Sequence, residues 1–93
     1  MKYVKCFRKE KNVCVEVELH NCRVIDVKIF GDFFVYPEDA IEKLENALRM
    51  CSTKECIEKA IESISRYSTP LGFSWSDLVE ALASIVEECS ERG

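Results

Sequence analysis

Glycine, proline and histidine are scarce in this chain of 93 residues, and it has no long apolar run. Its three glycines, Gly31, Gly72 and Gly93, lie too far apart to form a glycine-rich loop that binds phosphate. The single histidine, His20, falls in an expected turn, where nothing suggests a third group that would orient a Cys–His catalytic pair. No apolar stretch approaches the roughly 20 residues of a membrane helix. The N-terminus also lacks the apolar region of a signal peptide, so we expect a cytoplasmic protein with no membrane partner.

Positive charge is scarce in the second part of the chain. Residues 1–31 carry seven Lys or Arg against four Asp or Glu, whereas residues 32–93 carry six against thirteen. Binding to a nucleic-acid duplex requires clustered lysine and arginine, so we expect no nucleic acid as a partner. The basic first part leaves contact with an acidic surface open.

Cysteine, in contrast, is abundant, with six residues: Cys6, Cys14, Cys22, Cys51, Cys56 and Cys89. Three interpretations remain open. The one we prefer is that the cysteines serve as small apolar residues, because no export signal is present. The second is one or two disulfides of the kind found in the cytosol of hyperthermophiles. The third is metal or sulfur chemistry, although no C-x-x-C pair supports a zinc site.

The first 31 residues alternate between apolar and polar positions, as strands do. Residues 3–8, 13–19 and 24–30 predict three strands, and the third is expected to place Ile25, Val27 and Ile29 on one face. Asn21 suits the left-handed conformation of a short turn. Short turns between neighbouring strands predict an antiparallel meander.

After Pro37 the apolar residues recur at helical spacing. Pro37 suits the first turn of a helix, and this helix is expected to carry one apolar stripe formed by Ile41, Leu44, Leu48 and Cys51. Residues 52–55 resemble a capping box that starts a second helix, and residues 74–77 offer a cap for a third helix ending near Glu91. The predicted fold class is therefore α+β, a single two-layer domain over residues 1–93, with a three-stranded antiparallel meander followed by three helices packed on one face.

No motif completes an active site, which turns attention to the bend between sheet and helix. Residues 31–37 combine three aromatic residues with Gly31 and Asp32, whereas ordinary connections are polar. Consecutive residues of an extended segment point to opposite sides, so one of Phe33 and Phe34 can enter the core while the other stays exposed. Exposed aromatic clusters mark partner surfaces. We predict an interface formed by Phe30, Gly31, Asp32, Phe33, Phe34 and Tyr36, with no catalytic or metal-binding residue.

These residues also carry a resemblance to a known family. Residues 25–34 end in Gly-Asp-Phe-Phe, and an Ile-x-x-Leu-Glu-x-x-Leu pattern follows at residues 41–48. Together with residues 72–82, this pattern resembles the C-terminal accessory domain of lipoate–protein ligases, over about residues 3–86. The chain departs from that family at Cys22, where glycine is usual, and at Lys11-Asn12, where proline and glycine are frequent.

The resemblance implies a function and a fold. In some archaea this domain is a separate small protein, and a free chain of this length looks like that arrangement. ATP, magnesium and lipoate would bind to a large catalytic subunit, which forms lipoyl-AMP and transfers the lipoyl group to a lysine of an acceptor domain. The present chain would be its non-catalytic partner and would bind no cofactor alone. The implied fold is similar to that of iron–sulfur scaffold and sulfur-acceptor proteins.

The rival hypothesis is a sulfur or iron–sulfur carrier on the same fold. It would use Cys22, Cys51, Cys56 or Cys89 as ligands or as a persulfide carrier. Such a role requires exposed thiols, whereas Cys51 and Cys89 fall on predicted apolar stripes. A third hypothesis is a structural module that associates with itself.

Overall fold

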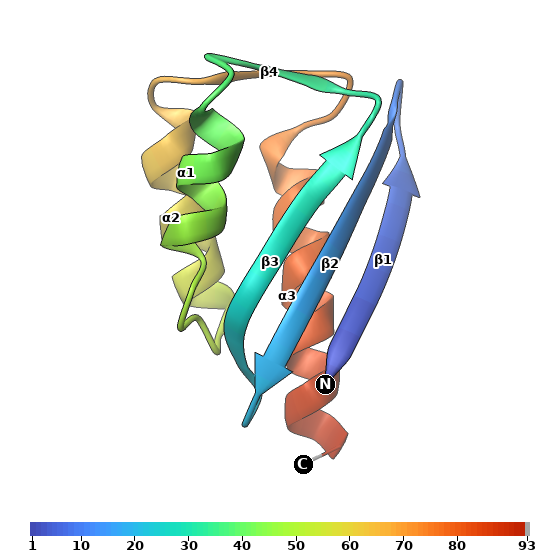
Figure 1. The fold of residues 1–93 in the computed structure, drawn as a ribbon, viewed down its shortest axis with the longest axis vertical. Coiled ribbons are helices and arrows are strands. Elements are labelled where there is room, and N and C mark those ends of the chain that lie inside the picture. The colour runs from blue at the N-terminus through green and yellow to red at the C-terminus, as the bar shows by residue number, and fades with distance from the viewer. Residues whose placement is uncertain (93) are drawn as a thin grey trace.

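The computed structural model describes residues 1–92, and these contain five strands and three helices (Figure 1). In chain order the elements are β1 (Lys2–Arg8), β2 (Asn12–His20), β3 (Arg23–Gly31), β4 (Phe34–Tyr36), α1 (Ala40–Ala47), α2 (Lys54–Ser65), β5 (Thr69–Leu71) and α3 (Trp75–Arg92). The predicted α+β class, with an antiparallel meander before the helices, is confirmed. None of the helices described has the length and apolar character needed to cross a bilayer.

The meander β1–β2–β3 places one face of β2 in the core and leaves the other uncovered. Val13, Val15, Val17 and Leu19 are buried, whereas the residues between them are partly exposed. In Figure 1, α3 lies behind the sheet, and α1 and α2 lie beside it near β3. The three helices bury their apolar stripes against this single face, with Leu44, Ile57 and Leu78 almost completely inaccessible to solvent. The sheet therefore has a helix-covered face and a free outer face.

A β-bulge in β3 corrects the predicted orientation of Ile25. Glu18 pairs with Asp26 but Leu19 pairs with Val24, so Ile25 is an extra residue on the β3 side. Because a bulge inserts one residue without a cross-strand partner, the side-chain alternation shifts at this point. Val24 is consequently buried, while Ile25 is 44% exposed. The prediction that Ile25 shares a face with Val27 and Ile29 is wrong.

The turn between β2 and β3 uses left-handed backbone at two consecutive residues. Asn21 has a φ of 53°, as its side chain predicts, and Cys22 has a φ of 60°. Glycine adopts this conformation without steric cost, whereas a residue with a side chain is strained there. Here Cys22 forms a disulfide with Cys89 of α3. The residue that strains the turn also fastens it to the last helix.

The first helix is shorter at both ends than the sequence predicts. Pro37 lies in a turn before α1, where its carbonyl accepts a hydrogen bond of 3.0 Å from the Ala40 N–H. The helical pattern begins after this turn, with the bond from the Lys43 N–H to the Asp39 carbonyl. At the other end Met50 has a φ of 73° and reverses the chain. Cys51 is therefore buried in a loop after the helix and not on its apolar stripe.

The second helix is capped one residue later than expected. Thr53 is the N-cap, and its hydroxyl accepts from the Cys56 N–H at 3.1 Å. The predicted capping box of Ser52 and Glu55 is wrong, because the N-cap is Thr53, which lies only two positions before Glu55, whereas a box requires a separation of three. Thr53 has the extended backbone that an N-cap adopts, with a φ of −135°.

This cap gives a direct test with a neighbouring control. We expect Thr53→Ala to lower the free energy of unfolding by about 1 kcal/mol, because one N–H of α2 loses its partner. Ser52→Ala should change it by less than about 0.5 kcal/mol. Urea denaturation of both variants measures the difference, and a larger loss for Ser52→Ala would assign the cap to Ser52.

All six cysteines are paired, which overturns the interpretation that they are small apolar residues. The disulfides join Cys6 to Cys14, Cys22 to Cys89 and Cys51 to Cys56. Spacing alone did not show the pairing, since six cysteines allow 15 connectivities. Only the Cys22–Cys89 bridge, with a separation of 67 residues, joins parts of the chain that are distant in the sequence.

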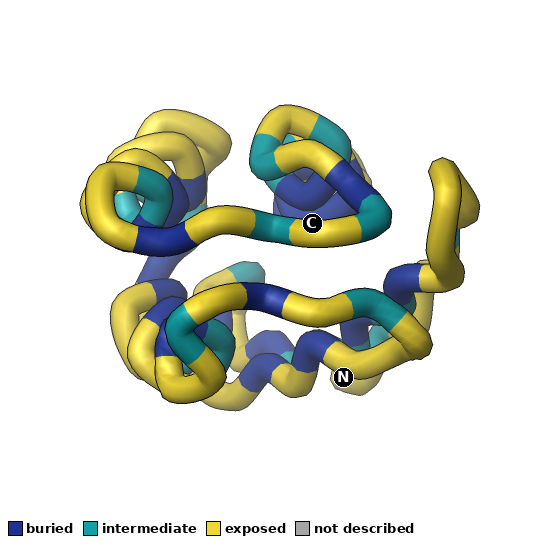
Figure 2. The backbone as a smooth tube through the Cα atoms, turned by 90° about the horizontal axis from the view of Figure 1, so that it is seen from above, coloured by how far each residue is buried: buried dark blue, intermediate teal, exposed yellow. Residues whose placement is uncertain are grey.

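Two short strands that the sequence did not predict form a second sheet. Phe34, Val35 and Tyr36 pair with Leu71, Pro70 and Thr69 in antiparallel register. Figure 2 looks down on this two-stranded ribbon, which crosses the end of the molecule above the helices. The bend between sheet and helix is thus a regular element with a partner strand, and its conformation is fixed by pairing.

Candidate partner interface

The ribbon of β4 and β5 presents apolar side chains to solvent. Phe34 and Tyr36 are 72% and 74% exposed, and the intervening Val35 is buried. Leu71 is directly opposite Phe34 and is 57% exposed. Residues two apart on a strand, and residues opposite one another across a pair, share a face. We refer to Phe34, Tyr36 and Leu71 as the outer patch.

Phe33 points the other way and anchors the ribbon to the core. Its ring meets the ring of Phe73 edge-on, with centroids 4.9 Å apart, and Phe73 meets Trp75 at 5.5 Å. Edge-to-face packing at these distances is favourable for aromatic rings. The predicted division of Phe33 and Phe34 between core and surface is confirmed. The packing of Phe33 against Phe73 therefore fixes the segment that bears the outer patch.

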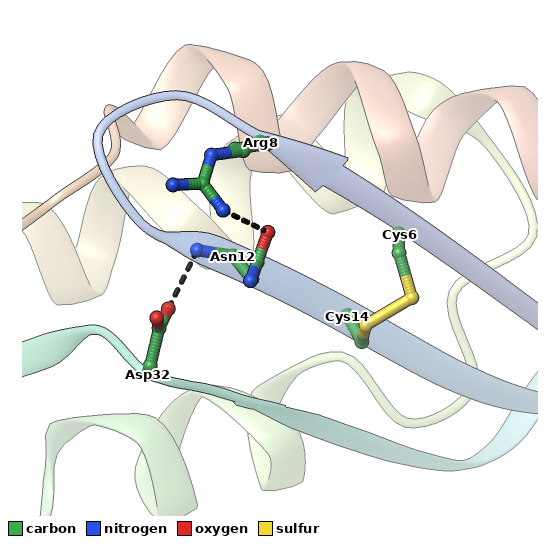
Figure 3. Close-up of a disulfide and its surroundings, with 5 residues drawn as sticks. All are labelled: Cys6, Arg8, Asn12, Cys14 and Asp32. Carbon is green, nitrogen blue, oxygen red and sulfur yellow. Dashed lines mark hydrogen bonds between the residues drawn. A yellow bond between two sulfur atoms is a disulfide. The ribbon is translucent and has the colours of Figure 1, made fainter.

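Gly31 and Asp32 attach the start of this segment to the β1–β2 hairpin. Asp32 accepts from the Asn12 N–H at 2.6 Å, and the Asp32 N–H donates to the Asn12 carbonyl at 3.2 Å (Figure 3). A Cβ added at Gly31, whose φ is 154°, would overlap that same carbonyl oxygen. Only glycine permits so close an approach. Asp32 is thus a local structural residue that fixes the bend.

The reciprocal pair between Asp32 and Asn12 predicts different effects for two substitutions. Asp32→Ala leaves the Asn12 N–H without its acceptor and should lower the free energy of unfolding by about 1 kcal/mol. Asp32→Asn retains an amide oxygen at the same position, so its loss should be smaller. Urea denaturation of both variants provides the measurement, and equal losses would show that the charge, and not the acceptor, holds the bend.

The other end of the ribbon is fastened to the same hairpin. The Lys11 N–H donates to the Gly72 carbonyl at 3.2 Å, directly after β5. A side chain at Gly72, whose φ is 103°, would run into the Lys11 side chain. Asp32 precedes β4 and Gly72 follows β5, so the hairpin tip holds the end of the ribbon where Phe34 faces Leu71.

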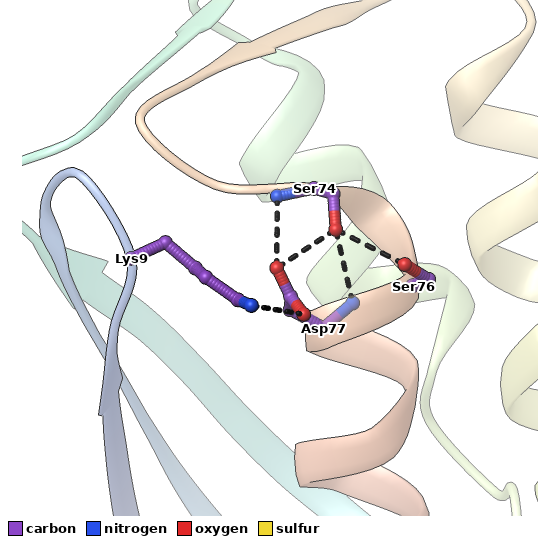
Figure 4. Close-up of polar contacts among 4 residues, drawn as sticks. All are labelled: Lys9, Ser74, Ser76 and Asp77. Carbon is purple, nitrogen blue, oxygen red and sulfur yellow. Dashed lines mark hydrogen bonds and ion pairs between the residues drawn. The ribbon is translucent and has the colours of Figure 1, made fainter.

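An ion pair and a helix cap lie next to the ribbon, between the β1–β2 hairpin and the start of α3. Lys9 lies 3.7 Å from Asp77, and Asp77 and Ser74 exchange hydrogen bonds at the start of α3 (Figure 4). This confirms the predicted cap. Between the hairpin and the segment Pro70–Asp77 lies an open cleft of about 890 Å³, lined by charges of both signs and by Leu71. The outer patch borders this cleft through Leu71.

The predicted interface residues do not all lie on one surface. Phe30 is 49% exposed but is in register with Cys14, on the free outer face of the meander. Phe33 is partly buried against the core, and Gly31 and Asp32 fix the bend through their contacts with Asn12. Leu71 was missed, because only the pairing of β4 with β5 brings it beside Phe34. Of the predicted interface residues, Phe34 and Tyr36 lie on the outer patch.

The described residues contain no group of three or more His, Cys, Asp or Glu residues that could hold a metal ion. His20, which was expected in a turn, is the exposed last residue of β2. No cysteine in the described part of the chain is free, which disfavours the sulfur-carrier hypothesis because a carrier needs a thiol.

Comparison with known proteins gives concordant matches. A sequence model described as bacterial lipoate protein ligase C-terminus matches residues 12–82. Lipoate-protein ligase A subunit 2 of Thermoplasma acidophilum is 31% identical over 86 residues, covering 91% of this chain and 92% of that protein. A solved structure of an archaeal lipoylation system from Thermoplasma acidophilum, with a bipartite lipoate protein ligase and its E2 lipoyl domain, contains a similar chain. The TM-score is 0.77 at 33% identity, covering 88% of this chain and 94% of that one.

Proposed function

Because this chain belongs to the family of lipoate–protein ligase C-terminal domains, we propose that it is the non-catalytic accessory subunit of a two-chain lipoate–protein ligase. One observation carries the proposal. The Thermoplasma relative is itself a subunit of such a ligase, and the match covers 92% of its length. The partner we propose is therefore a separate catalytic subunit.

In this proposal the catalytic subunit binds ATP, magnesium and lipoate and forms lipoyl-AMP, and the lipoyl acceptor domain meets the complex through that subunit. The present chain contributes by docking beside the adenylation site. A domain docked there can exclude water and hold mobile loops closed while the acyl phosphate linkage forms.

The outer patch is the docking surface that we propose. Phe34, Tyr36 and Leu71 are large, apolar and exposed, and Phe33 and the hairpin keep their backbone fixed. Rigid aromatic residues lose little entropy on binding and dominate the energy of many interfaces. Gly31 and Asp32 act in this interface as positioning residues, and Phe30 extends it only if the partner reaches the outer face of the meander.

We place this function in the cytoplasm. Disulfides are rare in most cytoplasmic proteins, but intracellular proteins of hyperthermophilic archaea and bacteria are rich in them. The three disulfides of this chain are thus compatible with such a compartment.

Activity of the mixed subunits tests the proposal. We expect the purified catalytic subunit to form lipoyl-AMP from lipoate and ATP only when this chain is added, with saturation at a fixed stoichiometry. Quantification of lipoyl-AMP by chromatography after a timed reaction gives the measurement. Equal formation of lipoyl-AMP with and without the chain would refute the accessory role.

A further inference from the structure

The three disulfides differ in their exposure to solvent. Cys6 is exposed and Cys14 partly exposed, on the outer face of the sheet that no helix covers. Neither of the other two bridges contains an exposed cysteine: Cys51 is completely buried, and Cys22, Cys56 and Cys89 are, like Cys14, only partly exposed. Thiol–disulfide exchange requires a thiolate to reach a sulfur atom, so exposed bridges are the labile ones.

The surroundings of the exposed bridge are suited to a small apolar reductant. Val4 precedes Cys6 on the same face of β1 and is 60% exposed. Phe30 is opposite Cys14 on the other side and is 49% exposed. The bridge thus lies between two exposed apolar side chains, which offer contact area to a hydrocarbon chain that carries a dithiol.

The exposed bridge also closes the hairpin that holds the outer patch. Cys6 and Cys14 are directly opposite in β1 and β2, and the next pair outward on that face is Arg8 with Asn12, joined by a hydrogen bond of 3.3 Å (Figure 3). Asn12 bonds to Asp32 before β4, and Lys11 bonds to Gly72 after β5. Two bonds therefore link the bridged hairpin to the end of the ribbon where Phe34 faces Leu71.

We propose that the Cys6–Cys14 disulfide is a thiol–disulfide exchange site for small dithiols, and that its reduction loosens the outer patch. One thiolate of the dithiol attacks a sulfur of the bridge, so that the S–S bond breaks and a mixed disulfide forms. The second thiolate then attacks the mixed disulfide. The dithiol leaves as a cyclic disulfide, oxidised by two electrons, and Cys6 and Cys14 take up two protons and remain as thiols.

Reduction removes the cross-link from the hairpin while the two buried or half-buried bridges persist. The freed strands gain conformational freedom near Asn12 and Lys11, which hold the ribbon. A less ordered patch must be ordered again on binding, and this costs affinity. The exchange site stands on the geometry of the isolated chain, whereas its effect on docking rests on the proposed function.

Alkylation during reduction tests the exchange site on the folded chain. The protein is titrated with dithiothreitol, quenched with iodoacetamide and analysed by peptide mass spectrometry. We expect Cys6 and Cys14 to be labelled at least about tenfold faster than the other four cysteines. In denaturant this preference should disappear. Simultaneous labelling of all six cysteines in the folded protein, or earlier labelling of Cys22 and Cys89, would overturn the proposal.

Matched variants test the coupling to the patch. Reduction should increase amide hydrogen exchange in residues 8–12 and 69–72, and Cys6→Ser with Cys14→Ser should show that increase without reductant. The control, Cys51→Ser with Cys56→Ser, should still respond to dithiothreitol. Selective reduction should weaken binding to the catalytic subunit about tenfold, and unchanged exchange or affinity would refute the coupling. If the oxidised chain also fails to bind, the proposed function is refuted, and the labelling result still decides the exchange site.

Discussion

Replacing both Cys22 and Cys89 by serine should lower the free energy of unfolding by about 4 kcal/mol, according to the loop-closure entropy of a disulfide. This bridge spans 67 residues and fastens the β2–β3 turn to the last helix. The loss is a large part of the 5–15 kcal/mol typical of a domain, and it should lower the melting temperature by about 15–30 °C. Serine at position 22 has the same backbone strain as cysteine, so this strain does not contribute to the difference in the free energy of unfolding.

The natural control is the double replacement of Cys6 and Cys14. Their separation of only eight residues predicts a smaller loss, about 2.5 kcal/mol on the same basis. Urea denaturation of both double variants without reductant gives the two free energies. Equal losses would show that loop closure does not explain how these bridges stabilise the chain.

The sequence predicts those parts of the fold that depend on neighbouring residues better than the parts that depend on contacts between distant segments. Apolar residues recur at every second position from Val13 to Leu19 and at helical spacing around Leu44. Because each pattern lies within one short segment, the sequence predicts the meander and the helices correctly. The orientation of Ile25 was predicted wrongly because it is set by a bulge, which depends on how β2 and β3 align. Cys51 was misplaced because a left-handed residue, Met50, ended the helix pattern early.

The candidate site divides in the same way. The opposite orientations of Phe33 and Phe34 follow from strand geometry alone, and the structure agrees. The position of Leu71 does not, because β5 is three residues long, contains Pro70, and pairs with a strand far away in the sequence. Asp32 presented the same difficulty, since its partner is the backbone of Asn12, 20 residues earlier. Long-range partners of very short elements leave no periodic signal.

The largest functional effect should come from the outer patch. We expect Phe34→Ala and Tyr36→Ala each to weaken binding to the catalytic subunit by about 30-fold, which corresponds to the roughly 2 kcal/mol of an interface hot spot. Because both side chains are more than 70% exposed, their removal should leave the melting temperature within about 2 °C of the parent chain. Leu71→Ala should weaken binding in the same direction.

Two phenylalanines elsewhere serve as controls for this experiment. Phe30→Ala removes an aromatic ring that is 49% exposed but lies on the outer face of the meander, and it should leave affinity nearly unchanged. Phe33→Ala removes the anchor against Phe73 and should lower stability by about 3 kcal/mol. Calorimetric titration of the catalytic subunit, with a thermal melt of each variant, separates the two effects. An equal loss of affinity for Phe30→Ala would move the interface onto the sheet face, and full affinity for Phe34→Ala and Tyr36→Ala would exclude the patch.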